Sequence, residues 1–187
     1  MSSCAKLVDS PETLAYAVLI RPAKGGGYVV TCRDLPELIT QGDCLEHALA
    51  EAVDAMDEAI AARMDDGEDL PAATTSRKGE HFVTPSAELG AKAALYLAMR
   101  EAGMSKAELA RRLQVDEKEV RRLLDPRHRS RLPRMDEALR ILGKRLVLSL
   151  CPMIEPAIAA AHGRDSHAPT TTLHIRRTSK GAPLSRG

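Results

Sequence analysis

Large apolar residues alternate with small or polar ones in the first part of the chain, a pattern typical of β-strands. Between Thr13 and Ile20 they recur at every second position, so this stretch is predicted to be a strand. Gly25, Gly26 and Gly27 follow, and residues 28–32 are again mostly apolar. Because glycine readily adopts the positive φ angles of tight turns, the pattern predicts a hairpin. Further short strands are predicted over 37–41 and 81–85.

The apolar spacing changes to three or four residues after Gly42, which indicates an amphipathic helix. Its apolar stripe consists of Leu45, Leu49, either Val53 or Ala52, Met56 and Ile60. Asp43 is predicted to cap the helix, with Glu46 completing a capping box, and Gly67 and Pro71 are predicted to end it. The opposite face carries an acidic ridge formed by Glu51, Asp54 and Glu58. Such a ridge is consistent with a binding surface and equally with an ordinary solvated face.

Three helix starts follow in the second half of the chain. Ser86 and Glu88 indicate a helix that ends at Gly103. Its predicted buried side consists of Leu89, Ala93, Ala94, Tyr96 and Leu97. Ser105 with Glu108, and Asp116 with Glu119, then form two capping boxes eleven residues apart. This spacing leaves room for a short helix, a tight turn and another short helix, so it predicts a helix-turn-helix.

Residue polarity within this motif agrees with a DNA reader. The residues predicted to face inward are Leu109, Ala110, Leu113, Val115, Val120 and Leu123. At 100° per residue, Lys118 and Arg122 point away from that core, with Arg121 at the flank. Gln114 occupies the turn, where a positive φ would strain a residue other than glycine. A charged helical hairpin packed in a small bundle is the alternative.

Basic side chains around the motif are the candidate DNA contacts. Base edges would be met by Lys118, Arg121 and Arg122. Phosphates would be met by Lys106, Arg111, Arg112 and three arginines of the following loop, Arg127, Arg129 and Arg131. That loop is also consistent with a simple solvated connection.

The helical half ends with an apolar segment that has no predicted sheet to join. An amphipathic helix through Met135, Leu139 and Leu142 precedes it, and Gly143 separates the two. We expect the segment to form a strand that pairs with a second copy of the chain. The predicted dimerisation residues are Leu146, Val147, Leu148 and Leu150.

Charge divides the chain into an acidic and a basic part. Residues 1–85 carry about twice as many acidic as basic side chains, whereas residues 86–151 carry an excess of Lys and Arg. We therefore expect an N-terminal segment over 1–12, an acidic domain over 13–85, a basic helical domain over 86–151 and a disordered tail over 152–187. Two kinds of partner, one basic and one acidic, suit this division.

No enzymatic or metal chemistry is expected. The four cysteines are widely spaced, and His47 and His81 lack partners for a nucleophilic site. A nuclease of the ribonuclease H type needs carboxylates around Mg²⁺, one of them in the first strand, and residues 13–20 contain none. We expect no cofactor. No basic-then-apolar leader and no membrane-length apolar run occur, so a cytoplasmic protein is expected.

Three segments together carry a family resemblance: the glycine-rich hairpin, "DLPELITQGD" and "VRRLLDPRHRSRL". Over residues 13–150 the chain resembles the HicB antitoxins that carry a C-terminal helix-turn-helix. The resemblance implies an α+β fold: a small antiparallel sheet with one covering helix, a partial ribonuclease H fold, followed by an all-α helix-turn-helix domain.

The resemblance also implies an antitoxin that neutralises HicA, a messenger-RNA-cleaving toxin, and represses its own operon as a DNA-bound dimer. The acidic ridge is the first candidate for the toxin contact, and the loop residues Asp34 and Glu37 are the second. A repressor that senses a small ligand, without a toxin partner, is the alternative. The tail after Cys151 is not explained by the resemblance.

Overall fold

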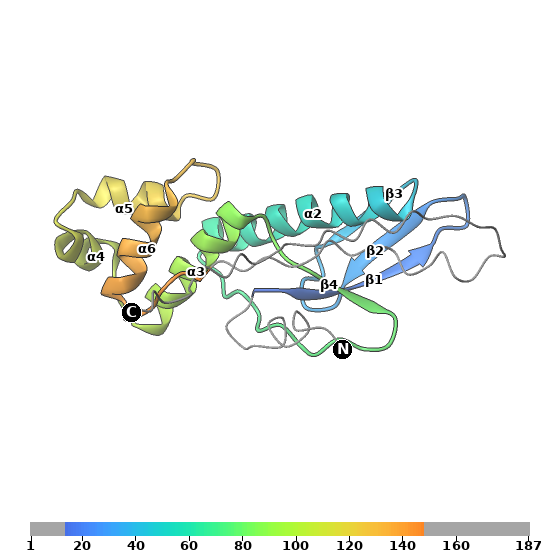
Figure 1. The fold of residues 1–187 in the computed structure, drawn as a ribbon, viewed down its shortest axis with the longest axis horizontal. Coiled ribbons are helices and arrows are strands. Elements are labelled where there is room, and N and C mark those ends of the chain that lie inside the picture. Colours follow the sequence, from blue (N-terminus) through green and yellow to red (C-terminus); the bar gives the residue numbers. More distant parts are fainter. Residues whose placement is uncertain (1–13, 148–187) are drawn as a thin grey trace, which may run out of the picture. The chain divides into compact units, whose positions relative to one another are not determined.

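A computed structural model describes residues 14–147 and contains a four-stranded antiparallel sheet (Figure 1). Its strands are β1 (Tyr16–Pro22), β2 (Tyr28–Cys32), β3 (Ile39–Gly42) and β4 (Glu80–Val83). They lie in the order β3-β2-β1-β4, so β1 pairs with β2 on one side and with β4 on the other. The predicted hairpin and the two further short strands are confirmed.

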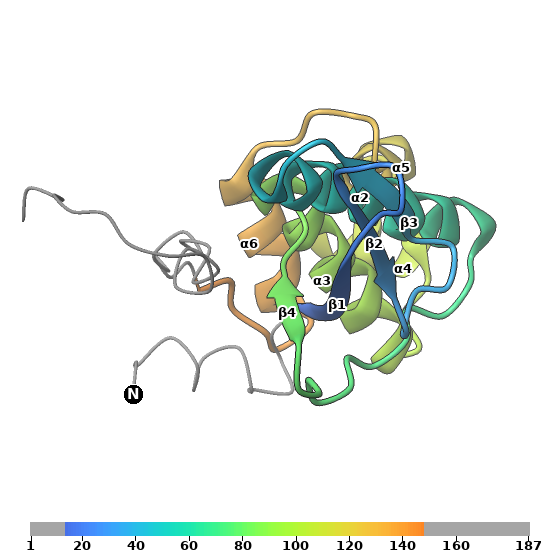
Figure 2. The same cartoon turned by 90° about the vertical axis from the view of Figure 1, so that its right-hand side faces the viewer.

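Helix α2 (Leu45–Asp66) packs along one face of this sheet (Figures 1 and 2). Tyr16 and Val18 of β1 and Val30 of β2 are fully buried against it. From α2, Met56 and Ile60 fill the same core, as the helical spacing predicts. The result is one helix over one sheet, which is the predicted α+β architecture.

The predicted cap of α2 is wrong by one residue. Cys44, not Asp43, is the N-cap, and its Sγ accepts a hydrogen bond from the backbone N–H of His47 at 3.5 Å. Asp43 lies one residue too early, and its own N–H donates to His47 Nδ1 at 3.3 Å. The predicted end is confirmed, because Gly67 has a φ of 71° and its N–H points back to the last carbonyls of the helix.

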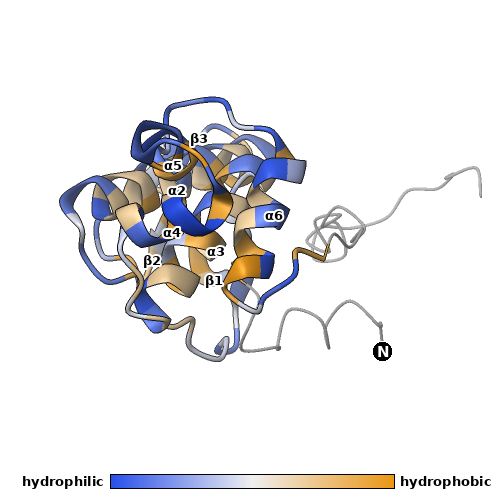
Figure 3. Cartoon of the chain, turned by 90° about the vertical axis from the view of Figure 1, so that its left-hand side faces the viewer, coloured by the Kyte–Doolittle hydropathy of each residue, from blue (hydrophilic) through white to orange (hydrophobic). Residues whose placement is uncertain are grey.

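Four helices make up the second half of the described chain: α3 (Ala87–Glu101), α4 (Lys106–Leu113), α5 (Glu117–Leu124) and α6 (Leu132–Ile141). They enclose a second apolar core, to which Leu95, Leu109, Val120 and Met135 contribute fully buried side chains. In Figure 3, these helices carry both hydrophobic and hydrophilic residues, as expected of amphipathic helices.

Helix α3 is buried on more of its surface than the sequence pattern predicts. Leu89 and Ala93 belong to the core against the sheet, as expected. Ala91, Leu95 and Met99 belong to the second core, and these were not in the predicted buried set. The pattern concealed the second face because alanines occupy much of it. Since α3 contributes to both cores, the domain boundary near Pro85 stays a prediction.

The apolar segment predicted to form a dimer strand is described only in part. Leu148 and Leu150 lie outside the described residues, as do the N-terminal segment 1–12 and the tail 152–187. Leu146 and Val147 are not in a strand. Leu146 packs against the second core and its N–H donates to Asp136 Oδ1 at 3.1 Å, whereas Val147 is 71% exposed. Within residues 14–147, no helix has the length and apolar character to span a lipid bilayer.

Close packing of α2 on the end of β3 leads to a first prediction. A Cβ atom added at Gly42 would lie 2.6 Å from the Cα of Ala48, which is backbone that cannot move without shifting the helix. We expect Gly42→Ala to lower the free energy of unfolding by about 1–3 kcal/mol. Thermal or urea unfolding measures this change.

Gly25→Ala is the matched control, because a Cβ at Gly25 meets nothing within 4 Å. Its effect should stay within about 0.5 kcal/mol. Equal stability of the Gly42→Ala variant and the unaltered chain would contradict the contact between β3 and α2.

Candidate functional site

Helices α4 and α5 are joined by a tight turn whose geometry follows the sequence pattern. Ser105 caps α4, with Oγ accepting a hydrogen bond from the N–H of Glu108 at 3.1 Å, but the second half of the predicted capping box is wrong, because the Glu108 carboxylate pairs with Arg111 and Arg112. Gln114 has a φ of 57° and a ψ of 44°, so the expected left-handed turn residue is confirmed. The N–H of Val115 then donates to the carbonyl of Ala110 at 3.0 Å and closes the turn.

The predicted capping box at the start of α5 is wrong. The helix begins at Glu117, but Asp116 makes no side-chain capping hydrogen bond. The Asp116 backbone carbonyl instead accepts from the N–H of Glu119 at 2.9 Å. The Glu119 carboxylate cannot reach back to the cap, because it pairs with Arg134 Nε of α6 at 2.8 Å.

The inward face of the two helices agrees with the predicted set. Five of the six predicted residues are buried and Val115 is half-buried; the buried ones are Leu109, Ala110, Leu113, Val120 and Leu123. Lys118, Arg121 and Arg122 are exposed. The residues that the spacing assigns to DNA contact therefore lie on the outward face of α5.

Ion pairs divide these cations into two groups. Arg121 pairs with Glu117 at 2.6 Å, and both Arg111 and Arg112 pair with Glu108. Within residues 14–147, Lys118 and Arg122 have no ion pair. Exposed pairs of this kind contribute about 0.3–0.5 kcal/mol on a helix, so phosphate could replace their carboxylates at little cost. Lys118 and Arg122 are available without any exchange.

The loop after α5 places its arginines differently from one another. Arg127 pairs with Asp65 and, at 3.8 Å, with Glu58, both on α2. Arg129 is exposed and makes no ion pair with any described residue. Lys106 is exposed at the start of α4. Of the predicted phosphate contacts, Arg127 is therefore the one that already has carboxylate partners from the first half of the chain.

On α2, the acidic ridge remains largely accessible. Asp54 is exposed without an ion pair among the described residues, and the Glu58 side chain is 81% exposed. Glu51 is half-buried and lies 3.3 Å from His47 Nε2. The ridge thus presents carboxylates that a basic partner could reach.

The second acidic candidate, in the loop before β3, is used within the chain. The Asp34 side chain is 5% exposed and accepts hydrogen bonds from the N–H and Oγ1 of Thr74, both at 2.9 Å. Glu37 accepts two hydrogen bonds from Arg63, which lower the pKa of Glu37. These carboxylates hold loops together, so the ridge on α2 is the better candidate for a partner.

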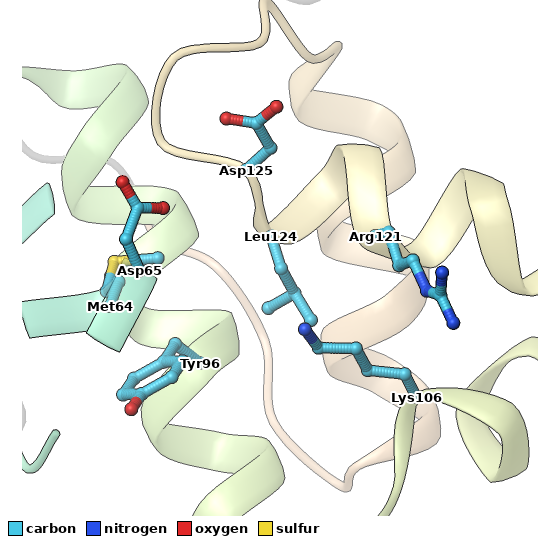
Figure 4. A pocket seen from close by; sticks show the side chains of 7 residues that line it. All are labelled: Met64, Asp65, Tyr96, Lys106, Arg121, Leu124 and Asp125. Atoms are coloured by element: carbon cyan, nitrogen blue, oxygen red, sulfur yellow. The ribbon is translucent and has the colours of Figure 1, made fainter. Parts of the chain in front are cut away.

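A cavity of about 170 Å³ lies where α2, α3, α4 and α5 meet (Figure 4). Side chains of both charge signs line it together with apolar ones: Met64, Asp65, Tyr96, Lys106, Arg121, Leu124 and Asp125. A second cavity, of about 260 Å³, lies beside the end of α3 and the start of α4. Pockets that bind small molecules usually enclose about 300–1,000 Å³, so neither cavity gives much support to a ligand-sensing role. No group of three metal-ligating side chains occurs within residues 14–147.

Comparison with known proteins shows which family the chain is similar to. Residues 15–94 match a family model described as the HicB-like antitoxin of a bacterial toxin–antitoxin system. Antitoxin HicB of Pseudomonas fluorescens (strain Pf0-1) is 37% identical over 136 residues, which cover 72% of this chain and 92% of that protein. Antitoxin HicB of Escherichia coli (strain K12) is 31% identical over 135 residues, or 72% and 98% of the two chains.

Antitoxin HicB 2 of Photorhabdus laumondii is 38% identical over 122 residues, which cover 65% of this chain and 86% of that protein. These matches span nearly the whole length of the relatives and include the sheet, α2 and the beginning of α3 within the family model. The chain therefore belongs to the HicB family of antitoxins of bacterial toxin–antitoxin systems.

Proposed function

We propose that the chain neutralises a small basic toxin of the HicA type and represses its own operon by binding operator DNA. The observation that carries the proposal is that accessible acidic side chains lie on one helix and accessible basic side chains on another. Asp54 and Glu58 are exposed on α2, while Lys118 and Arg122 are exposed on α5 without carboxylate partners in the described chain. An RNA-cleaving toxin needs a basic surface, which an acidic ridge can cover.

Residues 13–85 are the part that we assign to toxin binding, and residues 86–151 the part that we assign to DNA. In the second part, α5 would enter the major groove and α4 would cross the backbone, because the outward face of α5 holds the unpaired cations. The relatives are named antitoxins, which supports a binding role rather than a catalytic one. A protein that reads its own operator works in the cytoplasm.

We propose further that the chain reads DNA as a dimer. A helix-turn-helix reader usually needs a two-fold partner so that two α5 helices meet successive turns of the major groove. Val147 supports this proposal, since 71% of its surface is exposed at the start of the apolar segment. Burying Val147 against a second copy would remove apolar surface from water.

The toxin contact predicts a salt-dependent loss on charge reversal. In the full chain, Asp54→Lys combined with Glu58→Lys should weaken binding to the basic product of the neighbouring gene by roughly tenfold or more at low salt, and less at high salt. Co-expression followed by pull-down and titration measures the change. Glu137→Lys makes the same kind of charge change on α6 and should leave toxin binding unchanged.

Two outcomes would count against this part of the proposal. Wild-type affinity of the Asp54/Glu58 variant would remove the ridge as the toxin surface. If the unaltered chain does not bind the neighbouring gene product, the alternative function, a repressor that senses a small ligand, is favoured.

The DNA contact predicts different losses for base-reading and phosphate-binding residues. Arg122→Ala should cost about 1–3 kcal/mol on the operator and much less on a scrambled duplex. Arg111→Ala should weaken both duplexes alike and flatten the salt dependence, with a slope change of about 0.9 per lost phosphate contact. Titrations at two salt concentrations separate these cases, and protection of an inverted repeat would report the dimer.

Lys24→Ala, in the turn between β1 and β2, removes one positive charge far along the chain from α5 and serves as the control. Its operator affinity should match that of the unaltered chain. If a Lys118/Arg121/Arg122 triple alanine variant binds the operator with wild-type affinity, α5 does not read DNA.

A further inference from the structure

Lys92 is the one charged or polar residue within residues 14–147 that is fully buried, with 0% of its surface exposed. It lies on α3, and its Nζ donates hydrogen bonds to the backbone carbonyl of Asp125, at 2.7 Å, and to that of His128. Glu88, one turn earlier on α3, lies 3.6 Å from the same Nζ. The ammonium group thus joins α3 to the residues that follow α5.

Stability alone does not explain a lysine in this position. Taking an ammonium group out of water is costly even when it is paired, and apolar replacements of buried charges are often neutral or stabilising. The partners of Lys92 are mainly backbone carbonyls rather than a buried carboxylate. Asp125 is the C-cap of α5, so the cation lies at the negative end of that helix.

A second residue of α3, Glu88, holds the same loop at Ser130. The N–H of Ser130 donates to Glu88 Oε1 at 2.9 Å, and this hydrogen bond lowers the pKa of Glu88. Ser130 Oγ also donates to the carbonyl of Arg122 at 3.3 Å. The loop 125–130 is therefore fastened to α3 near both of its ends and to the last turn of α5.

We propose that Lys92, together with Glu88, is a positioning residue for DNA binding. It fixes the end of α5 and the loop 125–130 as one rigid unit, so that Arg122 on the helix and Arg129 in the loop meet a base edge and a phosphate in one binding geometry. This inference rests on the proposed DNA-binding function, and it adds a residue that touches no DNA. Holding the loop in place increases the affinity for DNA, because a mobile loop would lose conformational entropy when it binds.

The test is Lys92→Met in the full chain, which keeps an unbranched side chain, one atom shorter, and removes the charge. Three quantities are measured: thermal unfolding, affinity for duplex DNA taken from upstream of the chain's own gene and for a scrambled duplex, and the dependence of affinity on salt. We expect a folded protein with a lower unfolding temperature, because the carbonyls of Asp125 and His128 lose the donor that Lys92 supplies. Backbone amides of the loop 125–130 should exchange hydrogen faster.

Operator affinity of Lys92→Met should fall by roughly tenfold, with a salt slope shallower by about 1 because the Arg129 phosphate contact is lost. Lys78→Met is the matched control: Lys78 is exposed in the loop before β4, and the same loss of charge there should change neither quantity. Wild-type affinity and slope in a folded Lys92→Met protein would overturn the inference.

Glu88 supplies a second test if Lys92→Met does not fold. Its side chain is 43% exposed, so Glu88→Ala leaves the cores intact while it removes the acceptor for the Ser130 N–H. Glu88→Ala should weaken operator binding, and Glu88→Gln, which keeps an oxygen acceptor, should restore most of it. Full affinity of Glu88→Ala would overturn the inference. Failure of the unaltered chain to prefer its operator would instead overturn the proposed function, and the inference with it.

Discussion

The arrangement of the described chain depends on a single helix, α3, that has to bury two faces at once. Leu89 and Ala93 pack into the core against the sheet, while Leu95 and Met99 pack into the core of the helical half. A helix in this position has little surface left for water, so a lysine at residue 92 must find its partners inside. The carbonyls of Asp125 and His128 provide them. The same helix therefore packs into both cores and provides the buried ammonium group that binds the loop after α5. The loop is held in place as a consequence.

Sequence patterns predicted most of the local structure because the causes of local structure lie close together in the chain. The spacing of apolar residues predicted the strands β1 and β2 and the inward face of α4 and α5. It also predicted Gln114 as the turn residue between the two helices. The helix starts at Ser86, Ser105 and Asp116 are confirmed, but the capping side chains were less predictable, because neighbouring residues compete for them. The N-cap of α2 is Cys44, one residue after the predicted Asp43. At α5 the predicted capping box does not form, because Glu119 pairs with Arg134 and not with Asp116. Lys92 was missed for another reason: its acceptors lie 33 and 36 residues away, and nothing in the sequence around it points to them.

The candidate surfaces became narrower once contacts within the chain were known. From charge alone, Asp34 and Glu37 were the second candidate after the carboxylates of α2, but Asp34 accepts hydrogen bonds from Thr74 and Glu37 accepts them from Arg63. A carboxylate that accepts several hydrogen bonds inside the chain would lose them on binding a partner, which makes it a poor contact. Asp54 on α2 has no such cost. The same reasoning separates Arg122 from Arg121 on α5, because only Arg121 has a carboxylate to give up.

The two candidate surfaces meet at Arg127. This arginine belongs to the predicted phosphate contacts, and it lies 3.8 Å from Glu58, which belongs to the acidic ridge. Both side chains are mostly exposed, at 60% and 81%, so water and salt screen their attraction and the pair contributes little to stability. Glu58 can therefore turn towards a basic partner, whereas Arg127 also has a hydrogen bond to Asp65 that a phosphate would have to replace. The same loop is also held from α3, where Lys92 donates to the carbonyls of Asp125 and His128 and Glu88 accepts from the N–H of Ser130.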